Sequence, residues 1–208
     1  MDYVLFGIQG SGKGTQGKIL AQSLKAAYFE MGGELRHLAQ KPSELGKKVK
    51  NIIEAGNLVP ADVVLEIIEN FVRHSGKMAA VIWDGIPRNK DQNDRFEALL
   101  EKLGRKYKGI YFELSREEAK NRLLQRRICS QCKTVFPAVY KNNSCEKCRG
   151  KLITRTDDNA ESIRRRLELF FQETLPVVSA WRAADRLITV SAAGSIEAVT
   201  QELFSKTS

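Results

Sequence analysis

Apolar residues along this chain follow two alternating patterns, each typical of one kind of secondary structure. Short continuous apolar runs predict buried strands at residues 3–6, 26–29, 77–83, 109–114 and 187–190. Helical spacing fills the stretches between them, up to residue 24 and then at residues 32–40, 43–53, 61–74, 90–103, 115–126, 158–181 and 195–204. This alternation predicts an α/β fold, a parallel five-stranded sheet with helices on both faces that binds ligands at the carboxyl ends of its strands.

Polar residues mark where three of these helices begin. Ser43 is placed to cap one helix. Ser115 with Glu118, and Asp158 with Glu161, have the spacing of a capping box. The long segment that Asp158 would open runs to about residue 181.

A glycine-rich segment follows the first strand directly. Its residues are Gly7, Gly10, Gly12, Lys13 and Gly14. The pattern GxxxxGK[ST] is met as far as Lys13 and then broken, because Gly14 replaces the hydroxyl residue and Thr15 comes one position later. Backbone N–H groups of such a loop bind phosphate, and the lysine adds a positive charge. A glycine-rich turn without function is the alternative, which the preceding strand and the following helix disfavour.

A second polar segment, DGIPRNKDQ, follows the third predicted strand at residues 84–92. The Asp84 carboxylate can bind a hydrated Mg²⁺, and the Arg88 guanidinium can bind a phosphate. The Gln92 amide can form hydrogen bonds with the edge of a base. An acidic strand terminus with an ordinary turn is the alternative. Because parallel strands end at one edge of the sheet, we expect this segment beside the phosphate loop.

Charge and cysteines concentrate in one part of the chain. The net charge is +9, and residues 122–166 alone hold twelve Lys or Arg against four Asp or Glu. All four cysteines, Cys129, Cys132, Cys145 and Cys148, lie there as two CxxC pairs twelve residues apart. Two such pairs predict a structural Zn²⁺ bound by four thiolates, with two disulfides as the alternative.

Taken together, these motifs resemble the adenylate kinase family of nucleoside monophosphate kinases, in its form with a long zinc-bearing lid. The resemblance rests on the GKGTQ ending of the loop, on DGIPR, on RxxxR before the cysteines, and on RxDD and RxR after them. It implies a P-loop NTPase core at residues 1–127 and 159–208, a nucleoside monophosphate segment at residues 30–60, and a lid at residues 128–158. Gln9 stands where the family usually has proline.

The resemblance also implies roles for individual residues. ATP is expected to bind to Gly10, Ser11, Gly12, Lys13, Gly14, Thr15, Arg122 and Arg126. AMP is expected to bind to Met31, Arg36, Leu58, Val59, Gly85, Arg88, Gln92, Arg155 and Arg166. The implied catalytic set is Lys13, Arg88, Arg122, Arg126, Arg155, Arg166, Asp157 and Asp158, of which the two aspartates organise the closed lid. Asp84 would hold Mg²⁺ through water, and the four cysteines would hold zinc. Met31 departs from the family, which has a hydroxyl there.

The implied reaction is Mg²⁺-dependent transfer, ATP + AMP ⇌ 2 ADP, with ATP, AMP and ADP as the partners. A kinase acting on CMP or UMP is one alternative, because the residues around Met31 differ from the family, although Gln92 favours AMP. A zinc-ribbon protein that binds nucleic acid is another, suggested by the basic segment. It leaves the order of the kinase motifs unexplained, so we expect no stable nucleic acid partner.

Composition bounds the remaining expectations. The chain is 42% hydrophobic and 28% charged, and none of its apolar runs approaches the ~20 residues that span a bilayer. We therefore expect no membrane partner. We also expect a cytoplasmic location and a monomer.

Overall fold

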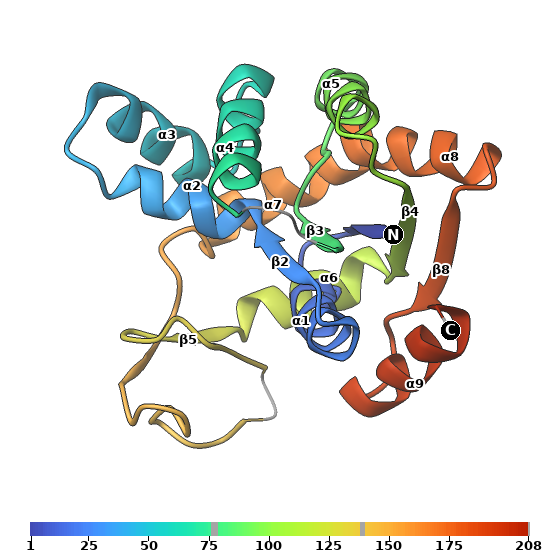
Figure 1. Ribbon diagram of the computed structural model, residues 1–208. Helices are drawn as coiled ribbons and strands as arrows, with labels where there is room; N and C mark the ends of the chain where they lie inside the picture. The colour runs from blue at the N-terminus through green and yellow to red at the C-terminus, as the bar shows by residue number, and fades with distance from the viewer. Residues whose placement is uncertain (76–78, 138–139, 208) are drawn as a thin grey trace.

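A five-stranded sheet forms the centre of the molecule (Figure 1), in the computed structural model, which describes residues 1–75, 79–137 and 140–207. Its order is β2-β3-β1-β4-β8, and every neighbouring pair is parallel. The strands are β1 (Asp2–Gly7), β2 (Ala27–Glu30), β3 (Val81–Asp84), β4 (Tyr107–Glu113) and β8 (Leu187–Ser191). The predicted parallel sheet is confirmed. The strand expected at residues 77–83 begins at Val81, and residues 77 and 78 lie outside the described part of the chain.

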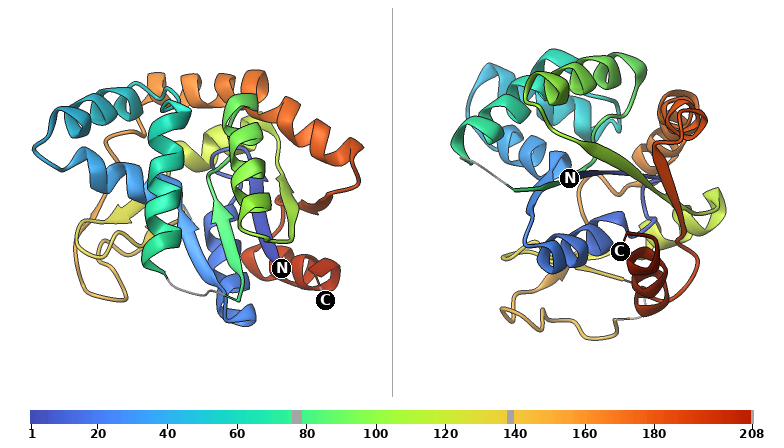
Figure 2. Two further views of the ribbon diagram at one scale, coloured as in Figure 1. Left: turned by 45° about the horizontal axis from the view of Figure 1, so that its top comes forward. Right: turned by 45° about the vertical axis from the view of Figure 1, so that its right-hand side comes forward.

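Helices cover both faces of this sheet. They are α1 (Lys13–Leu24), α2 (Met31–Ala39), α3 (Glu44–Glu54), α4 (Ala61–His74), α5 (Lys90–Lys102), α6 (Arg116–Leu124), α7 (Ala160–Leu169), α8 (Leu175–Ala183) and α9 (Ile196–Thr207). In Figures 1 and 2, α5 and α8 lie on one face and α1 and α9 on the other. A π-helical turn, η1 (Phe170–Thr174), joins α7 to α8. The long helix expected to about residue 181 is therefore continuous but contains this turn.

Two of the predicted helix caps are confirmed. Ser43 Oγ accepts a hydrogen bond from the N–H of Gly46, at 3.0 Å, and Ser115 Oγ accepts one from the N–H of Glu118, at 3.2 Å. The carboxylate of Glu118 pairs with Arg122 on the same helix. The capping box at Ser115 is thus only half formed.

The third predicted cap is wrong by one residue. Asn159, not Asp158, caps α7, and its Oδ1 accepts a hydrogen bond from the N–H of Ser162 at 2.8 Å. The reason is electrostatic, because the Asp158 carboxylate is fully buried between the guanidinium groups of Arg126 and Arg166. Two buried cations hold a carboxylate more strongly than backbone N–H groups at a helix end do.

The core lies between the sheet and its helices and is rich in aromatic rings. Trp83 of β3 is fully buried, and its ring centroid lies 5.3 Å from that of Phe29 and 5.4 Å from that of Phe96. Phe6 of β1 contacts Trp181 of α8 edge-on, with the ring centroids 4.9 Å apart. Rings of this size bury large apolar areas. They hold β1 and β3 rigidly, and with them the loops at their carboxyl ends.

A second, three-stranded antiparallel sheet stands away from the main one, at the lower left of Figure 1. Its order is β6-β5-β7, from β6 (Val135–Phe136), β5 (Arg127–Cys129) and β7 (Leu152–Ile153). It has a small core of its own, in which Phe136 packs against Tyr140. Phe136 is thus buried within this segment.

Among the described residues, none of the helices is both long enough and apolar enough to cross a membrane.

Candidate active site

The carboxyl ends of β1 and β3 lie side by side, and the polar segments of the sequence emerge there. Leu5 of β1 is aligned with Asp84 of β3, two residues before β1 ends at Gly7. The chain leaves β1 into the glycine-rich loop and leaves β3 into the segment that contains Arg88. This is the crevice position at which open parallel sheets bind ligands. The predicted meeting of the two segments is confirmed.

The glycine-rich loop has the backbone geometry that its glycines predict. Gly10 and Gly12 have φ values of +93° and +83°, in the left-handed region that favours glycine. A Cβ atom added to Gly10 would lie 2.8 Å from the carbonyl oxygen of Ala119. Helix α1 then begins at Lys13, and its first turn contains no acidic residue. Its free N–H groups and positive dipole end are available to an anion.

Gly14, which breaks the strict motif, lies against the carboxylate of β3. A Cβ atom at this position would stand 3.2 Å from Asp84 Oδ2 and 3.5 Å from the hydroxyl of Tyr28. A larger residue there would crowd the acid. The neighbouring hydroxyl residues differ in exposure, because Thr15 is exposed whereas Ser11 is buried.

Asp84 has a partner that the sequence did not reveal. The hydroxyl of Tyr28 donates a hydrogen bond to Asp84 Oδ2 at 2.6 Å. Burial raises the pKa of Tyr28, and the charge of Asp84 raises it further, so the phenol stays protonated. Only the pairing of β2 with β3 brings the two together, since Tyr28 is aligned with Ile82. A buried carboxylate at the mouth of a phosphate loop is a hard oxygen ligand that fits Mg²⁺.

Two cations flank Asp84. Burial lowers the pKa of Lys13 to about 8, the charge of Asp84 opposes this shift, and the charges of Arg88 and Arg126 add to it. Arg88 Nε donates to the carbonyl oxygen of Gly85 at 3.1 Å. Burial is the main cause that lowers the pKa of Arg88, and neighbouring arginines contribute. The site therefore concentrates positive charge, as a phosphate-binding site requires.

Gln92 is buried, and its amide forms hydrogen bonds within the protein. Its Oε1 accepts a hydrogen bond from the backbone N–H of Arg88 at 2.9 Å, and its Nε2 donates to the carbonyl oxygen of Val59 at 3.1 Å. The amide thus ties the arginine segment to the residues before α4. One N–H and one lone pair of the amide remain for a further partner.

Some residues of the predicted acceptor segment lie near the segment that follows β3. Met31 is buried and its Cβ lies 3.5 Å from the position of a Cβ at Gly85. Val59 is buried and Leu58 is partly exposed. Arg36 Nη2 donates to Glu30 Oε1 at 2.8 Å. Glu30 was not among the predicted site residues, although its place at the end of β2, next to Asp84, points to the site.

Carboxylates hold the arginines that flank the cysteine segment. Asp158 accepts hydrogen bonds from Arg126 Nε at 2.8 Å and from Arg166 Nη2 at 2.7 Å. Arg155 Nε donates to Asp157 Oδ1 at 2.8 Å, and hydrogen bonds from Arg155 help to lower the pKa of Asp157 to about 2, against the effect of burial. The structure thus brings Arg126, Arg155 and Arg166 together around the two aspartates.

Arg122 does not join this cluster. The helix predicted at residues 115–126 is shorter than expected, because α6 ends at Leu124. Beyond that end, Arg126 turns toward Asp158, whereas Arg122 remains on the helix and pairs with Glu118. Among the described residues Glu118 is its ion-pair partner.

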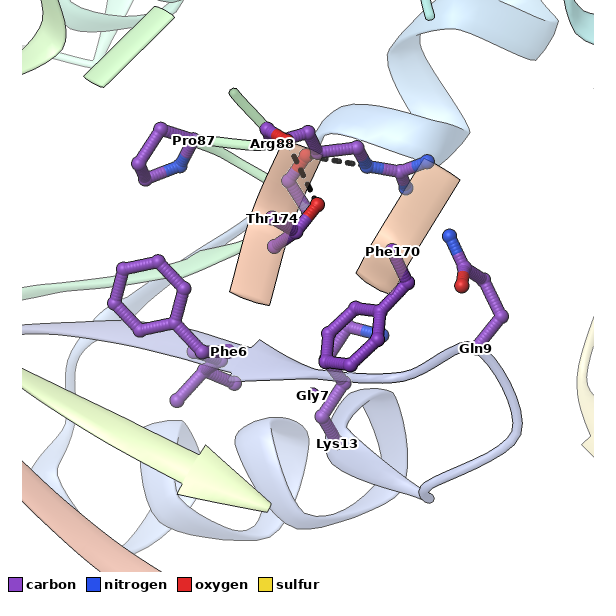
Figure 3. A pocket seen from close by; sticks show the side chains of 10 residues that line it. Phe6, Gly7, Gln9, Lys13, Pro87, Arg88, Phe170 and Thr174 are labelled. Carbon is purple, nitrogen blue, oxygen red and sulfur yellow. Dashed lines mark hydrogen bonds between the residues drawn. The ribbon is translucent and has the colours of Figure 1, made fainter. Parts of the chain in front are cut away.

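A small cavity of about 20 Å³ lies at the centre of the crevice. Its lining includes Gln9, Lys13, Arg88, Phe170 and Thr174. Figure 3 shows the side chains of Gln9 and Arg88 converging over it, from the phosphate loop and from the segment after β3. Thr174 Oγ1 donates to the carbonyl oxygen of Arg88 at 2.7 Å, so η1 fixes the backbone of this arginine.

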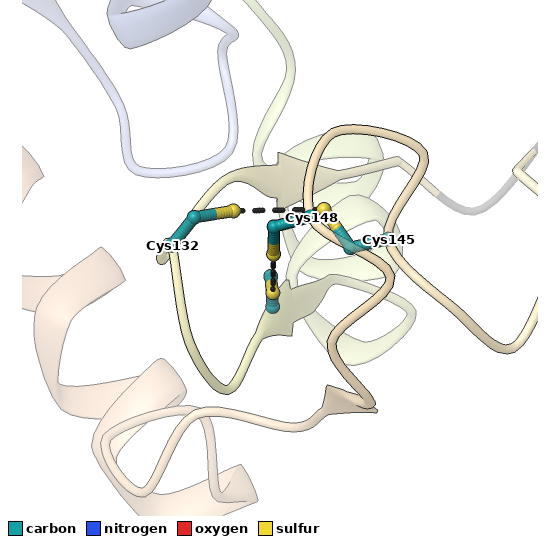
Figure 4. Close-up of side chains that lie close together, drawn as sticks. Cys132, Cys145 and Cys148 are labelled. Carbon is teal, nitrogen blue, oxygen red and sulfur yellow. Dashed lines mark hydrogen bonds between the residues drawn. The ribbon is translucent and has the colours of Figure 1, made fainter.

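The four cysteines come together in the small sheet, from two turns of similar shape (Figure 4). In each turn the residue after the second cysteine has positive φ, +59° at Lys133 and +60° at Arg149. The N–H of Lys133 donates to the carbonyl oxygen of Cys129, and that of Arg149 to the carbonyl oxygen of Cys145. These turns point both thiols of each pair inward.

The distances between the sulfur atoms fit a tetrahedral metal site. Cys129 and Cys148 have their Sγ atoms 3.3 Å apart, Cys132 and Cys145 have theirs 3.5 Å apart, and all four lie within 4.8 Å of one another. A Zn–S bond of about 2.3 Å places tetrahedral sulfurs about 3.8 Å apart. The cysteines are free thiols, so the structure does not support the disulfide alternative.

Comparison with known proteins agrees with this geometry. The family model described as Adenylate kinase matches residues 5–186 of the chain. Similar proteins named adenylate kinase include that of Thermosipho melanesiensis, 34% identical over 98% of this chain and 97% of the relative. That of Streptomyces avermitilis is 34% identical over 97% and 94%, and that of Kosmotoga olearia is 34% identical over 98% and 97%.

Proposed function

Because this chain belongs to the adenylate kinase family of nucleoside monophosphate kinases, we propose that it catalyses the reversible, Mg²⁺-dependent reaction ATP + AMP ⇌ 2 ADP by direct in-line transfer. The observation that carries the proposal is the meeting of three groups at one edge of the sheet. They are the lysine of the phosphate loop, Lys13, the buried carboxylate Asp84, and the anchored guanidinium of Arg88.

The proposed step needs no covalent intermediate on the protein. An oxygen of the AMP α-phosphate forms a bond to the γ-phosphorus of ATP while the bond from that phosphorus to the β–γ bridging oxygen breaks. The electron pair of the broken bond stays on the β-phosphate of the new ADP, and no proton has to move. Catalysis then consists of alignment and of stabilising the negative charge on the transferring group.

The residues around the cavity supply that stabilisation. The phosphate loop, residues 10–15, would hold the phosphates of ATP with Lys13 on the transferring group. Arg88 and Arg36 would hold the phosphate of AMP. The cluster of Arg126, Arg155 and Arg166, around the ends of the cysteine segment, would add positive charge. Phosphate oxygens would then compete with Asp157 and Asp158 for these guanidinium groups, and Arg122 would join from α6.

Metal ions have two separate places in this proposal. Asp84 would hold Mg²⁺ through water, and the ion, when bound, would neutralise charge on the ATP phosphates. A structural Zn²⁺ would be held by Cys129, Cys132, Cys145 and Cys148. Its binding would stabilise the fold of this segment, in addition to the small hydrophobic core. We propose that residues 128–158 form a lid over a core of residues 1–127 and 159–208, with residues 30–60 as the acceptor segment.

AMP is the proposed acceptor because of Gln92. Its spare N–H and lone pair match the donor and acceptor pattern of an adenine edge. Residues Met31, Leu58, Val59 and Gly85 would form the apolar and backbone surroundings of the base. The proposed ligands of this site are the substrates and products ATP, AMP and ADP.

The test is ADP production from Mg²⁺·ATP with AMP, CMP, UMP or GMP as acceptor, beside a reaction without acceptor. We expect strong preference for AMP, and near-complete loss of transfer in Lys13→Ala, since that variant lacks the charge on the transferring group. Preference for CMP or UMP would refute the proposed acceptor but not the mechanism. Absence of transfer to all four acceptors would refute the proposed function.

A further inference from the structure

Gln9 is a polar side chain at the reaction centre to which neither the family resemblance nor the charge pattern assigns a role. It lies in the phosphate loop between Ile8 and Gly10. Its side chain lines the same small cavity as Lys13 and Arg88. In Figure 3 it rises from the loop with its amide turned toward the guanidinium end of Arg88.

The amide of Gln9 has unused hydrogen-bonding capacity. Its Oε1 is buried and has no hydrogen-bond partner among residues 1–75, 79–137 and 140–207. A buried polar atom without a partner costs about 1–3 kcal/mol, so such atoms are rare and mark sites that a ligand completes. A half-turn about the terminal bond exchanges Oε1 and Nε2, so the amide can offer an acceptor or two donors to the cavity.

The charges around the cavity explain why a neutral donor suits this position. Burial lowers the pKa of both Lys13 and Arg88. The charge of Arg88 adds to the shift of Lys13, and neighbouring arginines add to that of Arg88. A third cation in the cavity would raise that cost. An amide adds a directed N–H bond without adding charge, and its dipole orients toward whatever anion enters.

We propose that Gln9 is a catalytic residue whose side-chain amide donates a hydrogen bond to an equatorial oxygen of the phosphoryl group during its transfer. The transferring group has three such oxygens, and Lys13 and Arg88 approach it from two sides. Gln9 covers a third side, from the loop. The bonds formed and broken are those described above, and the amide keeps its protons throughout. This proposal rests on the proposed kinase function.

A single-turnover experiment separates this role from a structural one. Rapid-quench measurement of ADP formation from Mg²⁺·ATP and AMP would compare the wild type with Gln9→Leu, which keeps the size but has no donor. We expect a loss of about 100-fold in the rate of transfer, as for removal of one donor to a developing anion. Dissociation constants of ATP and AMP, from calorimetry, should change by less than about threefold, because the bond strengthens only during transfer.

The matched control is Gln22→Leu, the same substitution at an exposed position of α1, which should leave the rate unchanged. If Gln9→Leu fails to fold, Gln9→Glu decides, since it keeps the shape but opposes the anion, and we expect at least the same loss. A Gln9 variant that is folded and transfers at the wild-type rate, or that loses only nucleotide affinity, would overturn the proposal and leave the kinase function intact. A wild type without transfer to AMP would overturn both.

Discussion

The ion pair between Glu30 and Arg36 yields a quantitative prediction about acceptor binding. Arg36 Nη2 lies 2.8 Å from Glu30 Oε1, and the same carboxylate lies 3.7 Å from Lys18 Nζ. If Arg36 binds the phosphate of AMP, as we propose, the carboxylate competes with that phosphate for the same guanidinium. Glu30→Gln removes the charge but keeps the shape, so AMP should bind more tightly to this variant.

The magnitude follows from the exposure of the pair. Both side chains are 36% exposed, and ion pairs in such positions contribute about 0.2–1 kcal/mol. Repulsion between the carboxylate and the AMP phosphate adds about 0.5 kcal/mol if the charges are roughly 8 Å apart in a water-like dielectric. The total is about 1 kcal/mol, which corresponds to a roughly fivefold lower dissociation constant.

The assay is calorimetric titration with AMP, together with the KM for AMP at saturating Mg²⁺·ATP. Glu44→Gln is the matched control, because Glu44 forms an exposed ion pair with Lys47 on α3, outside the crevice. In an Arg36→Ala background, Glu30→Gln should increase the affinity for AMP by less, because only the repulsion between Glu30 and the AMP phosphate is then removed. Higher salt should also reduce it. Unchanged or weaker AMP binding by Glu30→Gln would refute the competition.

Three further predictions concern charge burial and the metal site. Because burial lowers the pKa of Lys13 to about 8 from an ordinary value of 10.5, the folded protein binds fewer protons than the unfolded chain between these values. Burial of the charged ammonium group therefore destabilises the folded protein to its full extent below pH 8. Lys13→Met should raise the free energy of unfolding by up to about 3 kcal/mol at pH 7 and by clearly less at pH 9.5, in urea titrations; equal gains would contradict this. Asp158→Asn should lower that free energy by about 3–5 kcal/mol, since it removes the buried carboxylate that pairs with Arg126 and Arg166, whereas the exposed Asp94→Asn should leave it nearly unchanged. Similar losses in both variants would refute the buried network. Cys145→Ala should lose most of its zinc in elemental analysis of the purified protein, and unchanged zinc content would rule out the four-thiolate site.

The phosphate loop shows what local sequence can predict and where it stops. An apolar run, the glycine positions and helical spacing predicted the strand, loop and helix at residues 3–24. The glycines mark the loop because φ values near +90° exclude most other residues. The role of Gly14 became clear only with the structure, since the carboxylate that it approaches comes from β3. Tyr28, the partner of Asp84, was missed for the same reason.

The cysteine segment shows the same division. Two CxxC pairs predicted four thiols around one point, and the turns at Lys133 and Arg149 bring them there, since the spacing fixes the shape of each turn. The arginines on either side were predicted as a set, but not their partners. A carboxylate four residues away holds Arg122, whereas Asp158, far along the chain, holds Arg126.

The sequence by itself therefore determined the α/β fold, the order of its elements and the chemical groups of the site. These depend on periodicity, on glycine conformations and on motif spacing, all of which act over a few residues. The tertiary structure alone decided which charge pairs with which, as at Asp158 and Glu30, and which amide oxygen is buried without a partner, as at Gln9. Charged and amide side chains are long and have several possible partners, so burial and the packing of distant segments select among them.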